Sequence, residues 1–160
     1  MADLQLTERQ EINFEIDGSN FIEQVERLEN LLINSGSPDI YVGNSDELPL
    51  KHLFSDGIYT REIFIRKGLF AIGKIHKSDH AFFLMKGKLL LCGEDGVKEL
   101  EAPFYGTASA GTKRVAIALE DTVFVNVHPN PNNIKEIEKL EDIFVVSSYE
   151  EYIKYKLLNN

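Results

Sequence analysis

The sequence predicts a mainly β protein, a jelly roll or barrel, with one helix before the strands and helices after them. Short apolar segments separated by turn residues fill the stretch from about 58 to 128, and many short, evenly spaced strands are typical of such folds. Amphipathic segments with helical spacing flank this stretch on both sides. With 160 residues, 43% of them apolar, the chain is long enough for one domain with a real core.

The first zone, 1–57, is predicted to be an N-terminal extension that packs on the barrel. Three apolar residues alternate with polar ones, as in a half-buried strand: Ile12, Phe14 and Ile16. Asn20 followed by Glu23 resembles a helix N-cap with its capping-box partner. Apolar residues then recur at helical spacing, namely Ile22, Val25, Leu28 and Leu32. Gly36 is a suitable residue to end this helix.

The central zone, 58–128, is expected to form the barrel itself. The candidate strands are 60–66, 69–76, 81–86, 88–93, 97–101, 104–108, 114–119 and 122–128. Glycines and acidic pairs mark the turns between them: Gly68, Gly73, Gly87, Glu94-Asp95-Gly96, Gly111 and Glu120-Asp121.

The last zone, 129–160, is predicted to be a helical tail. Its first helix is expected from Asn133 to Leu140, where apolar residues recur at helical spacing. A second helix is expected to run to about Leu158. A serine followed by an acidic residue would cap its start: Ser147 or Ser148, with Glu150 or Glu151.

Glycines and histidines within the strand zone follow a regular spacing. Five residues separate Gly68 from Lys74, one separates Lys74 from His76, three separate His76 from His80, and six separate His80 from Gly87. This spacing resembles the first cupin motif, in which a glycine precedes His-x-His, then Glu, then glycine at the same separations. The resemblance implies a cupin-type jelly-roll barrel.

A second, degraded cupin motif follows after a spacer of 15 residues, similar to the shortest spacer in cupins. Arg114 stands at the position of the motif's histidine. The other matched positions are Pro103 for the opening glycine, Ser109 for the proline, Gly111 for the internal glycine and Ala118 for the asparagine. The chain also resembles small cupin-like proteins of tailed bacteriophages in the stretches 57–62, 73–80, 111–114, 120–122 and 128–130.

The cupin resemblance implies a metal site whose ligands have changed. The matching positions hold Lys74, His76, His80 and Arg114, and only the two histidines readily ligate a metal. A fixed cation 4 Å from a metal opposes it by about 4 kcal/mol per charge at an effective dielectric of about 20. Asp79 would complete a two-His, one-carboxylate site only if a turn brought it beside His80. We therefore expect no metal cofactor, with His76, His80 and Asp79 as the ligands if a metal is bound.

The same positions favour a small anionic ligand. Arg114 can bind a carboxylate or phosphate with two parallel hydrogen bonds, and Lys74 adds a point charge. His76 and His80 can donate hydrogen bonds to the same ligand. Further residues expected to contact it are Arg61, Tyr59 and Tyr105.

The histidines also have a structural alternative. His76 and His80 could be core residues satisfied by backbone partners, or could pair with Glu62 and Asp79. Most aromatic residues of the strands equally fit a barrel core. Two histidines outside the motifs are interpreted as surface or loop residues: His52 and His128.

Charge and composition exclude several classes of function. The formal net charge of −9 disfavours binding to nucleic acid polymers. The single cysteine, Cys92, cannot form an internal disulfide, which indicates a reducing compartment. The chain shows neither a signal peptide nor an apolar stretch long enough to cross a membrane. We expect a soluble protein of the cytoplasm, the host cytoplasm if it is phage-encoded.

Two functions of different classes are consistent with the sequence. The first is a metal-free cationic pocket that captures a phosphorylated or nucleotide-type ligand, for example a phage protein sequestering a host signalling nucleotide. The alternative is a metal-free nucleotide-sugar isomerase or epimerase, with His76 or His80 as general base. A metal-dependent cupin enzyme is a third, less favoured reading. The amphipathic helix near 20–35 further predicts a homo-oligomer.

Overall fold

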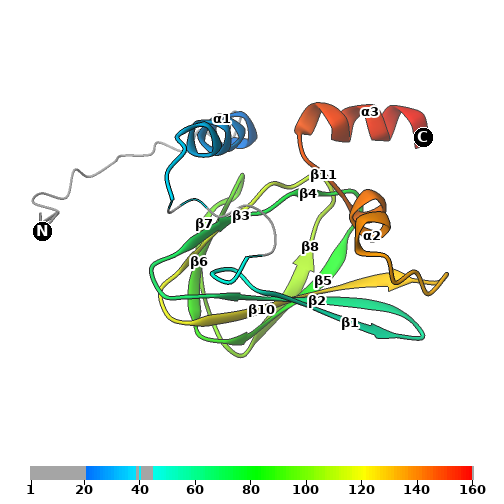
Figure 1. Cartoon of the computed structure of the whole chain (residues 1–160), viewed down its shortest axis with the longest axis horizontal. Helices are drawn as coiled ribbons and strands as arrows, with labels where there is room; N and C mark the ends of the chain where they lie inside the picture. Colours follow the sequence, from blue (N-terminus) through cyan, green and yellow to red (C-terminus); the bar gives the residue numbers. More distant parts are fainter. Residues whose placement is uncertain (1–20, 39, 41–44, 160) are drawn as a thin grey trace, which may run out of the picture.

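Two antiparallel sheets form the body of the protein, which confirms the predicted mainly β class. The computed structural model describes residues 21–38, 40 and 45–159. The larger sheet has the strand order β1 (Leu50–Ser55), β2 (Gly57–Ile65), β10 (Thr122–Asn130), β5 (His80–Lys86), β8 (Phe104–Ala108). The smaller has the order β3 (Phe70–Ile72), β9 (Val115–Ala118), β6 (Lys88–Gly93), β7 (Gly96–Glu101). The sheets curve around a common interior as a jelly-roll barrel (Figure 1).

The barrel interior is apolar toward one end because alternate residues of the strands point inward. Along β5, Phe82 and Leu84 are buried while Ala81 and Met85 are exposed. They pack against Leu89 of β6, so the two sheets share one core cluster. This alternation also directs His80, at the start of β5, toward the interior.

Three helices and a short two-stranded ladder complete the fold. Helices α1 (Phe21–Asn34) and α3 (Tyr149–Asn159) lie at the same end of the barrel, and α2 (Ile137–Phe144) lies beside the strands (Figure 1). Strand β11 (Val145–Val146) directly follows α2 and pairs with β4 (Ile75–His76). No helix among the described residues is long and apolar enough to cross a membrane.

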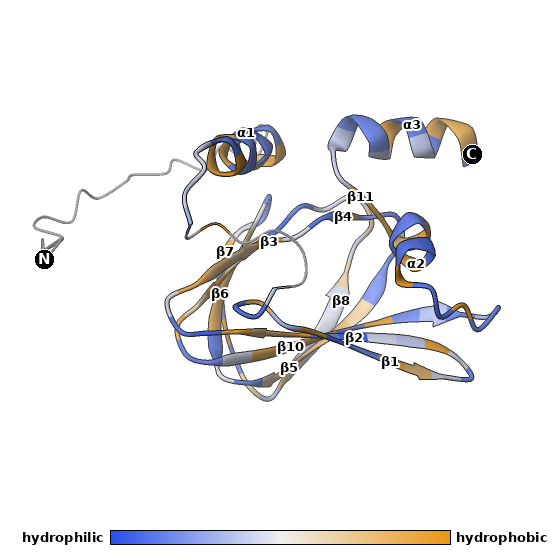
Figure 2. Ribbon diagram, viewed as in Figure 1, coloured by the Kyte–Doolittle hydropathy of each residue, from blue (hydrophilic) through white to orange (hydrophobic). Residues whose placement is uncertain are grey.

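The two helices at the barrel end pack on it in different ways. Helix α1 packs through an apolar face, and α3 through its buried Tyr152. Helix α1 bears hydrophobic and hydrophilic residues on different sides (Figure 2). Its buried Phe21, Ile22 and Val25 form one cluster with Ile75 of β4 and Tyr152 of α3. The end of the barrel is thus closed by side chains from both termini of the described chain.

Most predicted elements are confirmed, with three differences. The predicted strand 69–76 is divided into β3, in the smaller sheet, and β4, in the two-stranded ladder. The large sheet begins at Leu50, because β1 pairs with β2 inside the zone that was assigned to the N-terminal extension. Helix α2 begins at Ile137 rather than Asn133, whose φ of 50° lies in the left-handed region. The side chain of Asn133 instead ties the turn to Asp56 and Gly57 of the β1–β2 hairpin. The predicted strand with Ile12, Phe14 and Ile16, and the Asn20 cap, lie outside the described residues.

Two motif glycines are required by close packing as well as by backbone conformation. Gly87 has a φ of 81°, and a Cβ there would lie 2.3 Å from the carbonyl oxygen of Asp121. Gly111 has a φ of 80°, and a Cβ there would lie 2.5 Å from the ring of Tyr152. Both are positions where only glycine fits without rearrangement. The cupin-like spacing therefore reflects real constraints of this barrel.

Candidate functional site

Three histidines meet inside the barrel, each contributed by a different strand. His76 ends β4, His80 begins β5, and His128 lies near the end of β10. Strands β5 and β10 are neighbours, with Val127 opposite Ala81, so His80 and His128 project from the same inner face. Ring centroids of His76 and His80 are 3.9 Å apart, those of His80 and His128 4.7 Å, and those of His76 and His128 5.2 Å.

The hydrogen bonds of this three-histidine cluster are incomplete. The Nε2 atom of His80 lies 3.2 Å from Oδ1 of Asn126, and its Nδ1 lies 3.4 Å from the carbonyl oxygen of Ser78. The Nδ1 atoms of His76 and His128 are buried and have no hydrogen-bond partner among the described residues. A buried nitrogen without a partner costs about 1–3 kcal/mol, so two such atoms side by side call for an explanation.

All three imidazoles are held in the neutral form. Burial, followed by the repulsion that His76 and its neighbours His80 and His128 would exert on each other if protonated, lowers the pKa of His76 from 6.5 to about 2. Burial, followed by His80 and Arg61, lowers the pKa of His128 to about 3. Burial also lowers the pKa of His80, against the opposing effect of its two hydrogen bonds. Neutral imidazoles with free lone pairs are the ligands that Zn, Fe, Ni and Cu ions prefer.

The three histidines therefore fit a divalent metal ion. One potential ligand atom from each lies within 4.8 Å of the others, and the stacked rings would have to turn so that their lone pairs point at one ion at about 2.0–2.1 Å, the length of a zinc–imidazole bond. Neutral His80 has one N–H to share between the oxygens of Ser78 and Asn126, so its other ring nitrogen carries the lone pair that a metal needs. Three protein ligands leave at least one coordination position for water or a small molecule.

Helix α2 covers the open side of the cluster. The Phe144 ring stacks on His128 with a centroid distance of 4.4 Å and on Tyr59 at 5.9 Å. Leu140, only 1% exposed, belongs to the same apolar cluster. A small cavity remains under the helix. It is lined by Tyr59, Arg61, His128, Leu140, Glu141, Phe144 and Val145.

The predicted cations lie around the cluster, and two of them share one carboxylate. Glu141 of α2 is 3.7 Å from Arg61 of β2 and 3.2 Å from the Lys74 ammonium. Arg114 is half-buried and stands over the ring of Phe82, 5.9 Å from its centroid. Both arginines act on the histidines, since each lowers the pKa of His76 and of His80. Lys74 lies at the rim and is exposed.

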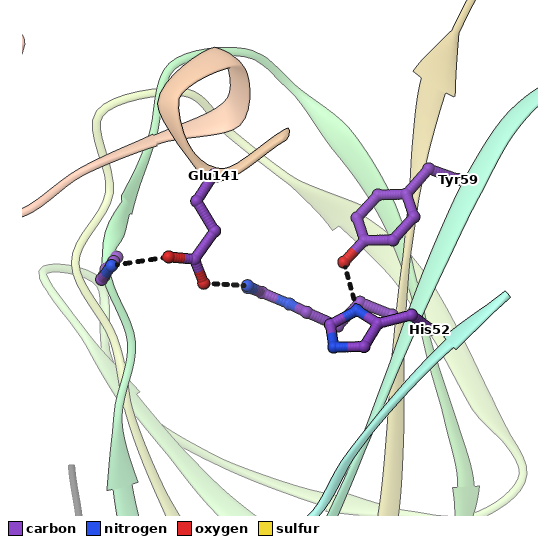
Figure 3. Close-up of polar contacts among 5 residues, drawn as sticks. His52, Tyr59 and Glu141 are labelled. Atoms are coloured by element: carbon purple, nitrogen blue, oxygen red, sulfur yellow. Dashed lines mark hydrogen bonds and ion pairs between the residues drawn. The ribbon is translucent and has the colours of Figure 1, made fainter. Parts of the chain in front are cut away.

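Other predicted site residues are placed elsewhere or have other partners. Tyr105 is 75% exposed and contacts Phe83 on the outer face of the sheet. The Asp79 carboxylate accepts a hydrogen bond from the backbone of Ala110 at 2.8 Å, and the residues that the structure groups as possible metal ligands are His76, His80 and His128. The hydroxyl of Tyr59 lies 2.7 Å from Nδ1 of His52 (Figure 3). Burial raises the pKa of Tyr59 and lowers that of His52, so this hydrogen bond joins two neutral groups.

The interpretation of His128 as a surface or loop residue is wrong. Its side chain is 2% exposed and it completes the three-histidine cluster. The sequence contained a usable signal, because His128 follows Phe124 and Asn126 at every second position of a predicted strand. His52 is half-buried on β1 rather than in a loop.

Comparisons with known proteins concern the barrel. No protein-family model matches the chain, and no curated protein matches it. Among solved structures, a salicylate 1,2-dioxygenase from Pseudaminobacter salicylatoxidans aligns with a TM-score of 0.51 at 11% identity, over 78% of this chain and 36% of that chain. The fold is cupin-like.

Two smaller structures align less closely with the cupin-like barrel. KdgF from Halomonas sp. has a TM-score of 0.49 at 13% identity, over 62% of this chain and 92% of that chain. A cupin-superfamily protein from Desulfitobacterium hafniense has a TM-score of 0.46 at 11% identity, over 56% of this chain and 83% of that chain. At such identities the likeness concerns the fold, and the chemistry must be argued from the residues of this chain.

Proposed function

We propose that this cupin-like protein holds a divalent metal ion through His76, His80 and His128 and binds a small molecule at that centre. The observation that carries the proposal is the pair of buried, unpartnered Nδ1 atoms on His76 and His128, in rings that face each other. A metal ion would satisfy these atoms and relieve their desolvation cost. When bound, it would supply a Lewis-acidic position for an oxygen of the ligand.

The sequence favoured an anionic ligand over a metal ion at this site. The third histidine strengthens the case for a metal. Lys74 and Arg114 stand at two cupin ligand positions, which argued against a metal. In the structure Lys74 is paired with Glu141, and β10 supplies His128 in place of the ligands that were lost. The proposed metal site therefore keeps two of the cupin ligand positions, His76 and His80, and takes its third ligand, His128, from β10.

The predicted anionic ligand remains part of the proposal. Arg61 and Arg114 lie close enough to the histidines to lower their pKa values, so a ligand with a carboxylate or phosphate would meet positive charge beside the metal. A phosphorylated or nucleotide-type molecule fits this description. A role in sequestering a host nucleotide is an extension drawn from the bacteriophage resemblance alone.

The isomerase alternative is less well supported. A general base works best when its pKa lies near the working pH, and the pKa of His76 is lowered to about 2. An imidazole of such low basicity is poorly suited to removing a proton near neutral pH.

Metal content of the purified protein tests the proposal. We expect about one equivalent of a divalent transition metal per chain, retained through dialysis and measured by elemental analysis. His76→Ala and His128→Ala should lose the metal. Asn126→Ala removes only the partner of His80, and should weaken metal binding by about 10- to 100-fold.

His52→Gln is the matched control, because His52 is a half-buried histidine outside the cluster that hydrogen-bonds to Tyr59. It should keep the metal. Wild-type protein that takes up no Zn, Fe, Ni or Cu from an equilibrated solution, while folded, would overturn the proposed centre. Mass spectrometry of molecules that co-purify with the protein would then identify the ligand.

A further inference from the structure

We propose that Arg61 and Lys74 form an anion-binding subsite of the same centre, which the carboxylate of Glu141 occupies in this structure. The inference rests on the proposed function for the position of the ligand, and it adds the place and the chemical class of the ligand's charged group. Glu141 is then a tethered competitor that an incoming carboxylate or phosphate displaces.

The Glu141 carboxylate lies between two cations. Its Oε1 faces the Arg61 guanidinium at 3.7 Å and its Oε2 faces the Lys74 ammonium at 3.2 Å (Figure 3). Arg61 lies on β2 and Lys74 lies in the segment between β3 and β4, while the carboxylate comes from the covering helix. Each oxygen of a ligand carboxylate, or two oxygens of a phosphate, would find the same two cations.

The subsite opens toward the three-histidine cluster. Arg61 and Glu141 line the same small cavity as His128. Lys74 precedes His76 by two residues, at the edge of β4. The cavity has a volume of only about 10 Å³, so a ligand that joined the cations to the histidines would have to displace the Glu141 side chain.

The carboxylate can leave without unfolding α2. The Glu141 side chain is 36% exposed and that of Lys74 is 46% exposed. Water or a solute can therefore replace either partner of this ion pair at little cost in free energy. The helix itself is anchored by other contacts. Leu140 and Phe144 are buried beneath it, and β11, which follows it, pairs with β4.

Removal of the Glu141 charge tests this inference with inorganic phosphate and acetate as probes. Chemical-shift titration of the full chain should show that Glu141→Gln binds phosphate about three- to tenfold more tightly than wild type, since the tethered carboxylate no longer competes for Arg61 and Lys74. Acetate should gain affinity in the same direction, and the larger gain will show which class the subsite prefers. Adding Arg61→Gln to Glu141→Gln should abolish the gain.

Glu138→Gln is the matched control, since Glu138 is exposed on the same helix and its substitution changes the net charge equally. An equal gain in Glu138→Gln would mean a general charge effect and would overturn the inference, as would no gain in Glu141→Gln. The titrations are run on protein with and without zinc. A chain that fails to bind metal contradicts the proposed centre, whereas the phosphate result in the metal-free chain decides the subsite separately.

Discussion

At the scale of single residues, burial has the same effect on each of the three histidines, because it lowers the pKa of every ring. His128 is 2% exposed and its pKa is lowered to about 3, while that of His76 is lowered to about 2. Protonating either ring inside the barrel would place a charge beside Arg61 and the other imidazoles. The folded state therefore takes up fewer protons than the unfolded chain, whose histidines titrate near 6.5.

This difference predicts an acid-sensitive fold for the metal-free protein. Because the folded pKa values are depressed, stability is fully present above pH 6.5 and falls as the pH drops below it. Between pH 7.5 and pH 5, His76 and His128 should each contribute a loss of about 2 kcal/mol in the free energy of unfolding. Urea denaturation of chelator-treated protein at the two pH values measures it.

A His76→Asn, His128→Asn double variant provides the comparison for this pH dependence. Its free energy of unfolding should change much less between pH 7.5 and pH 5. An equally steep loss in the double variant would mean that other groups, such as the carboxylates, cause the acid sensitivity.

The residue scale also shows what the sequence can and cannot predict about the site. His76 and His80 were found through motif spacing, which is set by local turn geometry at positions such as Gly87. His128 belongs to no motif, and its role arises from the pairing of β10 with β5, a long-range contact. Lys74 and Arg61 were identified, but their common partner Glu141 lies on a helix far along the chain.

At the scale of elements, α2 acts as the cover of the site through a few apolar contacts. Strand and helix positions followed from hydrophobic periodicity. The start of α2 and the existence of β1 did not, because both depend on the β1–β2 hairpin. The Asn133 side chain forms hydrogen bonds with Asp56 and Gly57 of that hairpin. Hydrophobic periodicity is a local pattern and does not predict such a long-range contact.

Truncation of Leu140 measures how firmly α2 is seated. Leu140 is 1% exposed and packs with Tyr59 and Phe144, so Leu140→Ala should lower the free energy of unfolding by about 3 kcal/mol. Ile143→Ala on the same helix is the control, because Ile143 is 48% exposed and its truncation should cost less than about 1 kcal/mol. Similar losses for the two variants would show that α2 does not pack as described.

At the scale of the whole molecule, the two flanking helices α1 and α3 close the same end of the barrel (Figure 1). Apolar contacts join Val25 of α1, Ile75 of β4 and Tyr152 of α3 in one cluster. A hydrogen bond also joins the two helices, since the backbone nitrogen of Tyr149 donates to Glu26 of α1 at 2.7 Å. Segments more than 100 residues apart in the chain are thereby held against β4, the strand that carries His76.

One buried ion pair attaches α1 to the barrel. The Lys113 ammonium, with a side chain that is 0% exposed, lies 2.7 Å from the carboxylate of Glu29, whose side chain is 30% exposed. Glu29→Gln would leave a buried positive charge without its counterion, and should lower the free energy of unfolding by roughly 3 kcal/mol. Arg27→Gln, on the exposed face of α1, should change it by less than about 0.5 kcal/mol.

Lys113→Met separates the ion pair from simple loss of a contact. This variant removes the buried charge itself, and the partly exposed Glu29 carboxylate can then be hydrated, so the cost should be smaller than that of Glu29→Gln. Denaturant unfolding of the three variants gives the order directly. If Lys113→Met is the more damaging substitution, the pair holds α1 through attraction rather than through the need to neutralise a buried lysine.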